Sequence, residues 1–374
     1  MPRVAEVALL FLRLGATTFG GPAAHIARME EEIVRRRGWL SHDELLDLVG
    51  AANLVPGPNS TEVAIHVGYK RAGWLGLVAA GVAFIAPAAL ATTALAWGYV
   101  TYGSLPQVAG MLRGVKPVIV AIVADAMWRF ARTAAKDTRL GVIGFVSAIA
   151  VALGVAELAV LAASGGVAML TRARGKGVRA GDGALLVASA PLSAAAAAGS
   201  ASIGGLFLMF LKIGAVLFGS GYVLLAFLRA DLVERRGWLT EGQLLDAVAA
   251  GQITPGPLFT TATFVGYLLH GGAGAAVATV GIFLPAFVFV ALSGPLVPRL
   301  RKSAAAGAFL DGVNVASVAL MVVVTVALAR EAFVDPVTIA MGVASLVVLA
   351  TRISKRVSSV WLVAAGAAVG WMRA

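Results

Sequence analysis

The amino-acid sequence predicts an all-α polytopic membrane protein built from two inverted-topology repeats with broken or re-entrant helices. Three observations support this fold class: an excess of apolar residues, one motif that occurs twice, and a charge bias that alternates between the two copies. Of 374 residues, 59% are hydrophobic, 13% are charged and a further 44 are glycine. Soluble domains carry about 25% charged residues. Because so few polar side chains cannot cover a globule, most of the outer surface is expected to face lipid.

The charge balance and the absence of cysteine exclude several functions. Thirty Lys and Arg against 19 Asp and Glu give a net charge of +11. In a polytopic membrane protein this excess is typical of cytoplasmic loops, so we expect no nucleic-acid partner. A chain without cysteine forms no disulfide and uses no thiolate, and its four scattered histidines favour neither a metal site nor a cofactor. The sequence has no phosphate-binding loop motif, which argues against ATP-driven transport by this chain.

One motif occurs twice along the chain. Adding 199 to a residue number in the first part gives its counterpart in the second, so the triplet PGP at 56–58 returns at 255–257, and after it the offset is 198. Fixed spacing of this kind indicates internal duplication. We therefore predict a first repeat at 1–170, a basic and then Ala-rich linker at 171–201, and a second repeat at 202–374, which the charge distribution below predicts to be inverted.

Apolar runs predict five helices in each repeat. The last two of each repeat are short for about 30 Å of hydrocarbon, so we expect each pair to form a compact hairpin. Residues 40–54 have apolar positions at helical spacing beneath several charges, which predicts an amphipathic or re-entrant helix that runs into the first PGP. The predicted helices are 4–24, 73–100, 108–130, 139–153 and 157–170 in the first repeat and 203–222, 272–296, 309–330, 337–350 and 357–372 in the second.

The distribution of Lys and Arg predicts that the repeats are inverted. In five pairs of equivalent loops, the loop that is basic in one repeat is poor in Lys and Arg in the other. Lys70 and Arg71, for example, correspond to 268–272, which has neither. Because Lys and Arg mark the cytoplasmic side, equivalent loops are expected on opposite faces. Inverted repeats are typical of secondary transporters, with duplication without transport as the alternative. The sequence leaves open whether 184–201 makes a further crossing.

The two PGP triplets lie inside apolar sequence. Proline removes an amide donor and clashes with the preceding turn, and broken backbone at membrane depth is tolerated where it lines a cavity. A helix that begins after such a break points free N–H groups and the positive end of its dipole at the cavity, which suits an oxyanion. A tight turn in a surface loop is the alternative. The candidate binding residues are Pro56, Gly57, Pro58, Asn59, Ser60 and Thr61 in the first repeat and Pro255, Gly256, Pro257, Thr260 and Thr261 in the second.

A second pair of breaks falls late in the first helix of each repeat. Glycines at such positions allow either an unwound turn around a ligand or close packing of helices. These candidates are Gly20, Gly21 and Pro22 in the first repeat and Gly219, Ser220 and Gly221 in the second.

Charged residues inside the predicted helices supply further candidates. Arg13 and Lys212 occupy equivalent positions, and a charge inside the bilayer usually faces a cavity, with snorkelling to the interface as the alternative. We expect both cations to converge on one anion site, where Lys116 adds a third contact. Glu62 and Asp125 are the candidates for ion coupling, although an arginine four residues after Asp125 neutralises it in the simpler interpretation.

The segment 11–69, with TFGGP, RGWL and PGP in this order, and its counterpart at 210–267 resemble the chromate transporter family in its long, two-domain form. The resemblance implies a bacterial inner-membrane carrier that exports chromate, with sulfate as a chemically similar substrate. The motif residues that it singles out here are Gly20, Gly21, Pro22 and both PGP triplets. The second repeat departs from the pattern with Gly-Ser-Gly at 219–221, so the two breaks need not act alike.

These arguments combine into one functional hypothesis. We expect secondary active export of chromate, with the anion bound between the two PGP breaks and the Arg13 and Lys212 pair. The expected partners are chromate or a sulfate-like oxyanion and the lipid bilayer, with a homodimer as one option. We expect no cofactor, no metal and no enzyme activity. The alternatives are a carrier for another oxyanion such as sulfate and, more distantly, a membrane-embedded enzyme acting on lipid phosphates.

Overall fold

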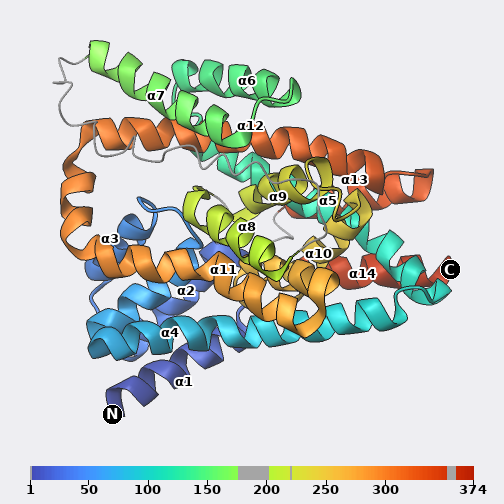
Figure 1. Ribbon diagram of the computed structural model, residues 1–374, viewed down its shortest axis with the longest axis horizontal. Coiled ribbons are helices and arrows are strands. Elements are labelled where there is room, and N and C mark those ends of the chain that lie inside the picture. The colour runs from blue at the N-terminus through green and yellow to red at the C-terminus, as the bar shows by residue number, and fades with distance from the viewer. Residues whose placement is uncertain (1, 176–201, 220, 352–358) are drawn as a thin grey trace.

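Helices account for the architecture of the computed structural model, which describes residues 2–175, 202–219, 221–351 and 359–374 and contains no strand in these ranges (Figure 1). Four of its helices are long and apolar enough to cross a membrane. They are α4 (Asn59–Tyr102), α5 (Pro106–Ala134), α11 (Thr261–Lys302) and α12 (Ala304–Ala332). The predicted all-α membrane fold is therefore confirmed.

Shorter helices complete the fold. Those at 42–52, 138–152, 157–175, 336–350 and 359–372 begin and end within about five residues of the predicted ranges, whereas Gly21–Met29, Leu224–Leu228 and Glu241–Ile253 were not predicted as separate helices. The first helix of each repeat is shorter than predicted, because it stops before the glycines that were expected to break it. These elements are α1 (Pro2–Thr17), α2 (Gly21–Met29), α3 (His42–Ala52), α6 (Thr138–Ala152), α7 (Glu157–Gly175), α8 (Ile203–Val216), α9 (Leu224–Leu228), α10 (Glu241–Ile253), α13 (Pro336–Ala350) and α14 (Ser359–Met372), with π-helical turns at Glu30–Arg36 and Arg229–Glu234.

α4 and α11 each consist of two antiparallel arms. The backbone is non-helical at Ala72 and Gly73 in α4 and at His270 and Gly271 in α11. We call 59–71 and 261–269 the first arms, and 74–102 and 272–302 the second arms. A hydrogen bond of 2.7 Å joins the hydroxyls of Thr263 and Thr279 across α11, so its arms lie side by side. In α4 the same closeness depends on Gly68 and Gly76, where a Cβ would meet the facing backbone.

The N-terminal helices of the first half form hairpins whose ends meet at one surface. Lys70, at the end of the first arm of α4, pairs with Glu44 near the start of α3 at 3.1 Å. Arg71 pairs at 3.0 Å with Glu6 on α1, which Arg37 also approaches at 3.4 Å. The start of α1, the start of α3 and the end of the first arm of α4 therefore lie together at one surface. The breaks at the other ends of these helices lie on the opposite, inner side of the first half.

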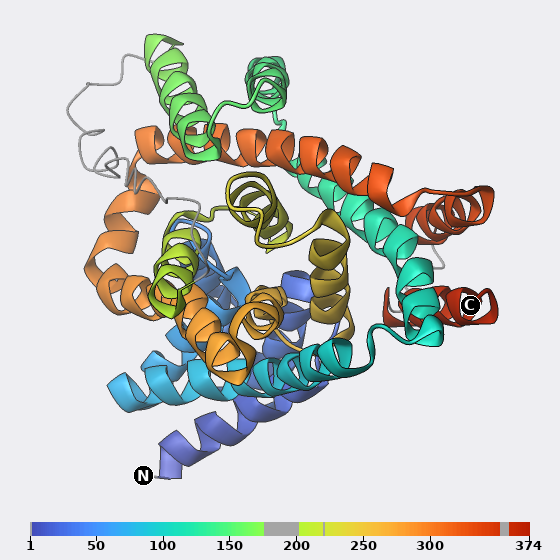
Figure 2. The ribbon, with the colours of Figure 1, turned by 45° about the vertical axis from the view of Figure 1, so that its right-hand side comes forward.

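The two halves of the chain interlock. α6 and α7 form a hairpin joined by Ser147 and Ser164, whose hydroxyls are 2.8 Å apart, and this hairpin packs on α12. α13 and α14 of the second half pack on α5 of the first half. In both views α8, α9 and α10 lie between the long helices α4 and α12 (Figures 1 and 2). The short helices around the breaks of the second half therefore lie inside a frame of longer ones.

Some predictions fall outside the described residues, and the structure does not bear on them. These are the crossing at 184–201, most of the linker at 171–201, and Ser220. They also include several Lys and Arg residues of the five loop pairs whose charge predicted the inversion: Lys176, Arg179, Arg352, Lys355, Arg356 and the side chains of Arg174, Arg299, Arg301 and Lys302.

Candidate functional site

A glycine with a positive φ value lies at each of the four helix breaks. Gly20 and Gly21, between α1 and α2, have φ values of 103° and 77°, and Gly219 after α8 has 93°. Gly57 and Gly256, in the middle of the PGP triplets, have φ values of 139° and 99°. Residues with a Cβ rarely adopt this region of backbone space, whereas glycine enters it at little cost. The sequence therefore places glycine where the chain reverses.

Each PGP triplet is bound to the break in the first helix of the other half. The amide of Gly57 donates to the carbonyl of Leu217 at 2.8 Å, and the amide of Gly256 donates to the carbonyl of Thr18 at 3.0 Å. Gly57 and Gly256 are equivalent at the offset of 199, and so are Thr18 and Leu217. The two halves therefore make the same hydrogen bond reciprocally, each from its own triplet to the first-helix break of the other half. We call these the exchanged hydrogen bonds. They satisfy backbone amides that the broken helices leave without an acceptor.

A small cavity lies among the four breaks. Its volume is about 20 Å³, enough for one water molecule and too small for a tetrahedral oxyanion. The conformation therefore holds the breaks closed around a core of proline and glycine. The lining residues are Pro22, His25, Pro58, Asn59, Ser60, Gly219, Gly221, Pro257, Leu258 and Phe259.

The predicted hydroxyl and amide groups of the two halves behave differently. Ser60 lines the cavity, whereas Asn59 also donates to Asn53 Oδ1 at 2.6 Å. Thr61 is buried, and its hydroxyl has no partner among the described residues. Thr260 and Thr261 each donate to a backbone carbonyl three residues earlier at 2.9 Å. In this conformation the hydroxyls of the second half are therefore engaged with their own backbone.

His25 is a site residue that sequence reasoning missed. It is buried on α2, its Nδ1 lies 3.1 Å from Ser60 Oγ, and its Nε2 lies 3.3 Å from the Thr18 carbonyl that receives Gly256. His25 thus connects three of the four breaks and lines the cavity. The available signal was its position three residues after Gly-Gly-Pro, and its counterpart at the offset of 199 is Leu224.

The three predicted cations do not line the cavity, contrary to the expectation that they converge there. Arg13 is exposed on α1. Lys212 lies 3.1 Å from Asp231, a buried carboxylate that also binds Arg235 at 2.6 Å. The physical reason is that Lys212 helps to neutralise the buried carboxylate of Asp231. If Lys212 faced the cavity instead, this buried carboxylate would lose one of its two cations.

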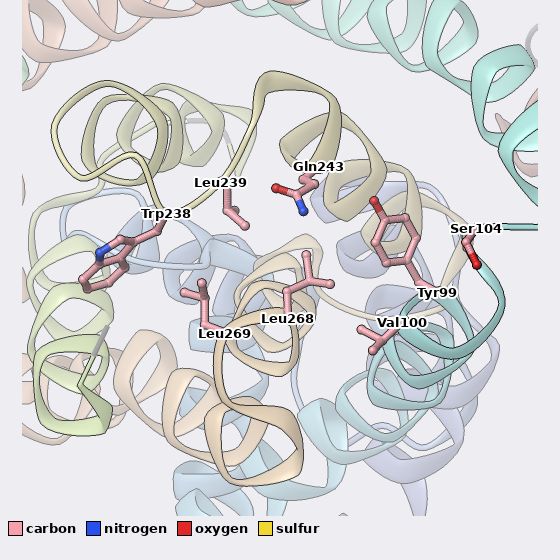
Figure 3. A pocket seen from close by; sticks show the side chains of 9 residues that line it. Tyr99, Val100, Ser104, Trp238, Leu239, Gln243, Leu268 and Leu269 are labelled. Atoms are coloured by element: carbon pink, nitrogen blue, oxygen red, sulfur yellow. The ribbon is translucent and has the colours of Figure 1, made fainter. Parts of the chain in front are cut away.

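The third cation, Lys116, belongs to a different part of the molecule. Its Nζ lies 4.0 Å from Asp246 on α10, which also accepts a hydrogen bond from the Tyr99 hydroxyl at 3.1 Å. Tyr99 lines a larger pocket of about 350 Å³ between the end of α4, the approach to α10 and the turn of α11, into which Gln243 and Leu268 also extend (Figure 3). This pocket shares no lining residue with the cavity among the breaks.

The two acidic candidates have opposite environments. Asp125 is paired with Arg129 at 2.7 Å, as the simpler interpretation of its spacing predicts. Glu62 is fully buried at the start of α4, and neither of its carboxyl oxygens has a hydrogen-bond partner among the described residues. Its Oε1 occupies the space beside Gly57 that a side chain at that position would need. Glu62 is therefore the acidic group next to a PGP break.

Helices of membrane-spanning length around a centre of broken helices define a polytopic helical membrane protein. The model of the chromate transporter family matches residues 5–170 and again 204–371, and the chain belongs to this family. The resemblance noted in the sequence is thereby confirmed.

Individual relatives cover nearly the whole chain. A chromate transport protein of Cupriavidus metallidurans is 32% identical over 98% of this chain and 92% of its own length. A chromate transport protein of Pseudomonas aeruginosa is 33% identical over 97% of this chain and 90% of its own length. A probable chromate transport protein of Synechococcus elongatus is 32% identical over 90% of this chain and 87% of its own length. No solved structure matches the chain.

Proposed function

We propose that this protein is a secondary active transporter that exports chromate across the bacterial inner membrane. Family membership supports chromate as the substrate, because three relatives of nearly full length carry chromate transport in their names. The observation that carries the proposal is the exchanged pair of hydrogen bonds between the triplets and the first-helix breaks. Two backbones broken at membrane depth and joined to each other are typical of a substrate site between transporter repeats.

In this proposal the anion binds among the four breaks. The start of α4 after Pro58 presents amide groups and the positive end of a helix dipole, and Ser60 and His25 add polar groups within the cavity. Because the cavity of about 20 Å³ excludes an oxyanion, the breaks must separate before the anion enters. The structure thus represents a closed, unloaded state of the transport cycle in this proposal.

Inverted repeats would give the two open states. Lys70 and Arg71 end the first arm of α4. Their equivalents, Leu268 and Leu269, share a pocket with Val100, at the far end of the second arm of α4, and with Ser104 just beyond it. The second arm spans about 40 Å at 1.5 Å per residue, which is the full thickness of a membrane. This separation of equivalent positions, together with the alternating charge, supports an alternating-access mechanism in which one repeat rocks against the other.

Transport of labelled chromate by purified protein in vesicles tests the proposal. We expect wild-type vesicles to equilibrate labelled chromate, and protein-free vesicles not to. His25→Leu, which installs the residue of the second half, should slow this movement up to about 30-fold, because it removes two polar contacts worth about 1 kcal/mol each. Wild-type protein that leaves labelled chromate outside the vesicles would refute the proposed function.

Substrate and direction need separate measurements. Competition by unlabelled sulfate, molybdate and phosphate ranks the oxyanions, and stronger inhibition by sulfate than by chromate itself would make sulfate the preferred substrate. Everted membrane vesicles from bacteria that express the protein should accumulate chromate if the physiological direction is export. Accumulation only in right-side-out vesicles would reverse the proposed direction.

A further inference from the structure

The helices α3 and α10 are equivalent in the two halves, and they differ in how much of their surface is covered. Leu245 of α10 is fully buried, whereas its equivalent Leu46 on α3 is 53% exposed. Asp246 is 6% exposed, whereas its equivalent Asp47 is exposed. α10 packs on α5, α12 and α14, while the main contacts of α3 among the described elements are with α4, α11 and the π-helical turn Glu30–Arg36. The closed conformation is therefore asymmetric.

The asymmetry arises from the placement of α5 and α12. Among the described elements, these two helices pack mainly on the broken helices of the second half, beside α9 and α10 in both views (Figures 1 and 2). Two inverted units of one backbone can take each other's roles, which is how such repeats produce two related states. In the opposite state α5 and α12 would pack on α2 and α3, and α10 would become exposed.

The two membrane faces indicate which state the structure is closer to. Trp238 and Leu269 line the pocket of about 350 Å³ beside the loop that joins α4 to α5. Their equivalents Trp39 and Arg71 contact each other, with the guanidinium 4.8 Å from the centre of the Trp39 ring, and Arg71 also pairs with Glu6. Positive charge marks the end at Arg71 as cytoplasmic. The structure is therefore closed at its cytoplasmic face and hollow at its outer face.

Lys116 on α5 lies near two carboxylates of the second half in this state. Its Nζ is 4.0 Å from Asp246 Oδ2 on α10. The same Nζ and Oε1 of Glu331 on α12 lie 2.9 Å and 3.1 Å from the point that a Cβ on Gly242 would occupy. Lys116 therefore compensates the buried charge of Asp246 for as long as α10 packs on α5.

Asn314 on α12, the equivalent of Lys116 at the offset of 198, indicates where Lys116 would go. Its Oδ1 lies 3.4 Å from the point that a Cβ on Gly219 would occupy, and Gly219 lines the cavity among the breaks. Gly20 is the equivalent of Gly219. A reversal of roles therefore brings Lys116 to the break at Gly20. Its longer side chain would add an ammonium group to a cavity whose described lining has neither Lys nor Arg.

We propose that Lys116 binds the anion at the break around Gly20 in the opposite, cytoplasm-facing state, and that Asp246 withdraws it in the state seen here. The inference rests on the proposed function. One ammonium group has two alternative partners, so the carboxylate of Asp246 competes with the anion for Lys116. The anion is held on the cytoplasmic side and loses this cation when the outer face is hollow. Binding inside and release outside is the direction of export, and the step moves no proton and makes no covalent bond.

The reversal of roles gives both aspartates water or a donor. In the opposite state α10 takes the exposed position that α3 has here, so Asp246 faces water as Asp47 does now. Asp47 comes to lie beside Asn314, which offers an amide donor without a positive charge. The state seen here thus has one ion pair more, so the empty transporter favours it. The anion favours the opposite state, because it binds Lys116 there.

The kinetics of labelled chromate entering everted vesicles, whose cytoplasmic face is outward, test the competition. Asp246→Asn keeps the shape of the side chain and removes the competitor. We expect the half-saturating chromate concentration and the maximal rate both to fall several-fold, because Lys116 stays with the anion. Lys116→Asn installs the residue of the second half and should raise the half-saturating concentration about 10- to 100-fold, the value of a hydrogen bond to a charged group. Arg113→Gln, at an exposed position of α5, is the matched control and should change neither quantity.

A double variant separates anion binding from compensation of Asp246. Lys116→Asn combined with Asp246→Asn leaves no buried charge, yet we expect it to keep the raised half-saturating concentration, because the cation is still missing. Recovery of wild-type kinetics by this double variant would show that Lys116 only compensates Asp246, and would overturn the inference. An unchanged or raised half-saturating concentration for Asp246→Asn would do the same. All these outcomes leave wild-type transport intact, whereas absence of wild-type chromate movement would remove the proposed function.

Cysteine pairs test the reversal of roles in a chain that has no cysteine of its own. Gly242→Cys with Glu331→Cys joins α10 to α12 in the present state, and the equivalent pair, Asp43→Cys with Thr133→Cys, joins α3 to α5 in the opposite state. Under mild oxidation we expect the first pair to cross-link faster without chromate, and saturating chromate to speed the second pair several-fold. A second pair that never cross-links, in protein that moves chromate like wild type when reduced, would refute the reversal.

Discussion

The first arms of α4 and α11 follow equivalent triplets, adopt the same hairpin with their second arms, and differ in chemistry. Both begin after Pro-Gly-Pro, and both turn at a glycine with a φ value near 60°. The arm of α4 carries Glu62 and His66, whereas the second half has Thr260 just before the arm of α11 and Phe264 within it. The two copies thus share their backbone geometry, whereas the titratable side chains Glu62 and His66 occur in one copy alone.

This comparison separates two kinds of residue. Glycines and prolines at the breaks occur in both copies because the exchanged hydrogen bonds require the same chain reversal twice. Side chains that face the site can differ between equivalent positions of the two halves, because the backbone hydrogen bonds at the breaks do not depend on them. His25, opposite Leu224, follows the same rule as Glu62. We therefore expect substitutions of the shared backbone positions to affect folding and those of the unshared side chains to affect transport.

The largest effect is expected from alanine at the central glycine of the triplets. Both positions have positive φ, which costs about 1–3 kcal/mol for a residue with a Cβ. At Gly256 the new Cβ would also lie 2.7 Å from Ala88 Cβ and 3.2 Å from the carbonyl of Gly15, whereas at Gly57 it meets the movable carboxyl end of Glu62. Gly256→Ala should therefore lower the thermal unfolding temperature in detergent more than Gly57→Ala.

Gly73→Ala provides the matched control for backbone strain. Gly73 has a φ value of 63°, and no atom of the described residues lies within 4 Å of the point that a Cβ would occupy, so this variant carries the strain without the clash. An unfolding temperature for Gly256→Ala equal to that of Gly73→Ala would contradict the close packing of the second triplet.

An intermediate effect is expected where the equivalent cations differ. Lys212→Met removes one of two cations from the buried carboxylate of Asp231 and should cost about 1.5–3 kcal/mol, the value of a hydrogen bond to a charged group. Arg13→Met, at an exposed position, should change stability by no more than about 0.5 kcal/mol. Thermal unfolding and chromate movement, measured on both variants, separate the roles. Loss of transport by stable Arg13→Met protein would support the anion-binding role predicted from the sequence, and wild-type transport would remove it.

The smallest effect is expected at the caps of α6 and α13. Asp137 and Asp335 occupy equivalent positions and accept hydrogen bonds from the amides of Leu140 and Thr338. The Thr338 amide, followed by nearby Arg373, lowers the pKa of the Asp335 carboxyl. Since the folded pKa lies below the unfolded value of about 3.9, the stabilisation is present above that pH and is lost as the pH falls through the lower folded value.

Asp335→Asn should therefore weaken this acid sensitivity with only a small change in unfolding temperature at neutral pH. Unfolding temperatures of wild type and variant, compared between pH 7 and the acid limit of the protein's solubility, provide the measurement. A steeper loss of stability in acid for Asp335→Asn than for wild type would contradict the assigned sign.

Much of the architecture could be predicted because it depends on local pattern. Apolar runs fixed most helix ranges to within a few residues, and the spacing of Asp125 and Arg129 predicted their ion pair. The amphipathic segment at 40–54 became α3, which leads directly into the first triplet. The glycines and prolines marked the breaks, since few other residues adopt the backbone that a reversal needs.

The members of the site depended on contacts between distant segments. Sequence spacing shows that Gly57 and Gly256 are equivalent, and tertiary structure shows that each binds the other half's first-helix break, at Leu217 and Thr18. The sequence predicts that Lys212 is a cation of the anion site, whereas the structure pairs its side chain with the carboxylate of Asp231. His25 had no local signal strong enough to mark it, because its partners Ser60 and Thr18 come from two other helices.

Composition and duplication by themselves determined that this chain is a helical membrane protein with paired breaks, because hydrophobicity, helical period and glycine's backbone freedom act on neighbouring residues. Tertiary structure decided which breaks touch, which cations are already neutralised and which acid is buried without a partner in the described part of the chain. Those outcomes depend on how segments 160 and 238 positions apart, Gly57 with Leu217 and Thr18 with Gly256, meet in space, and no local pattern encodes that meeting.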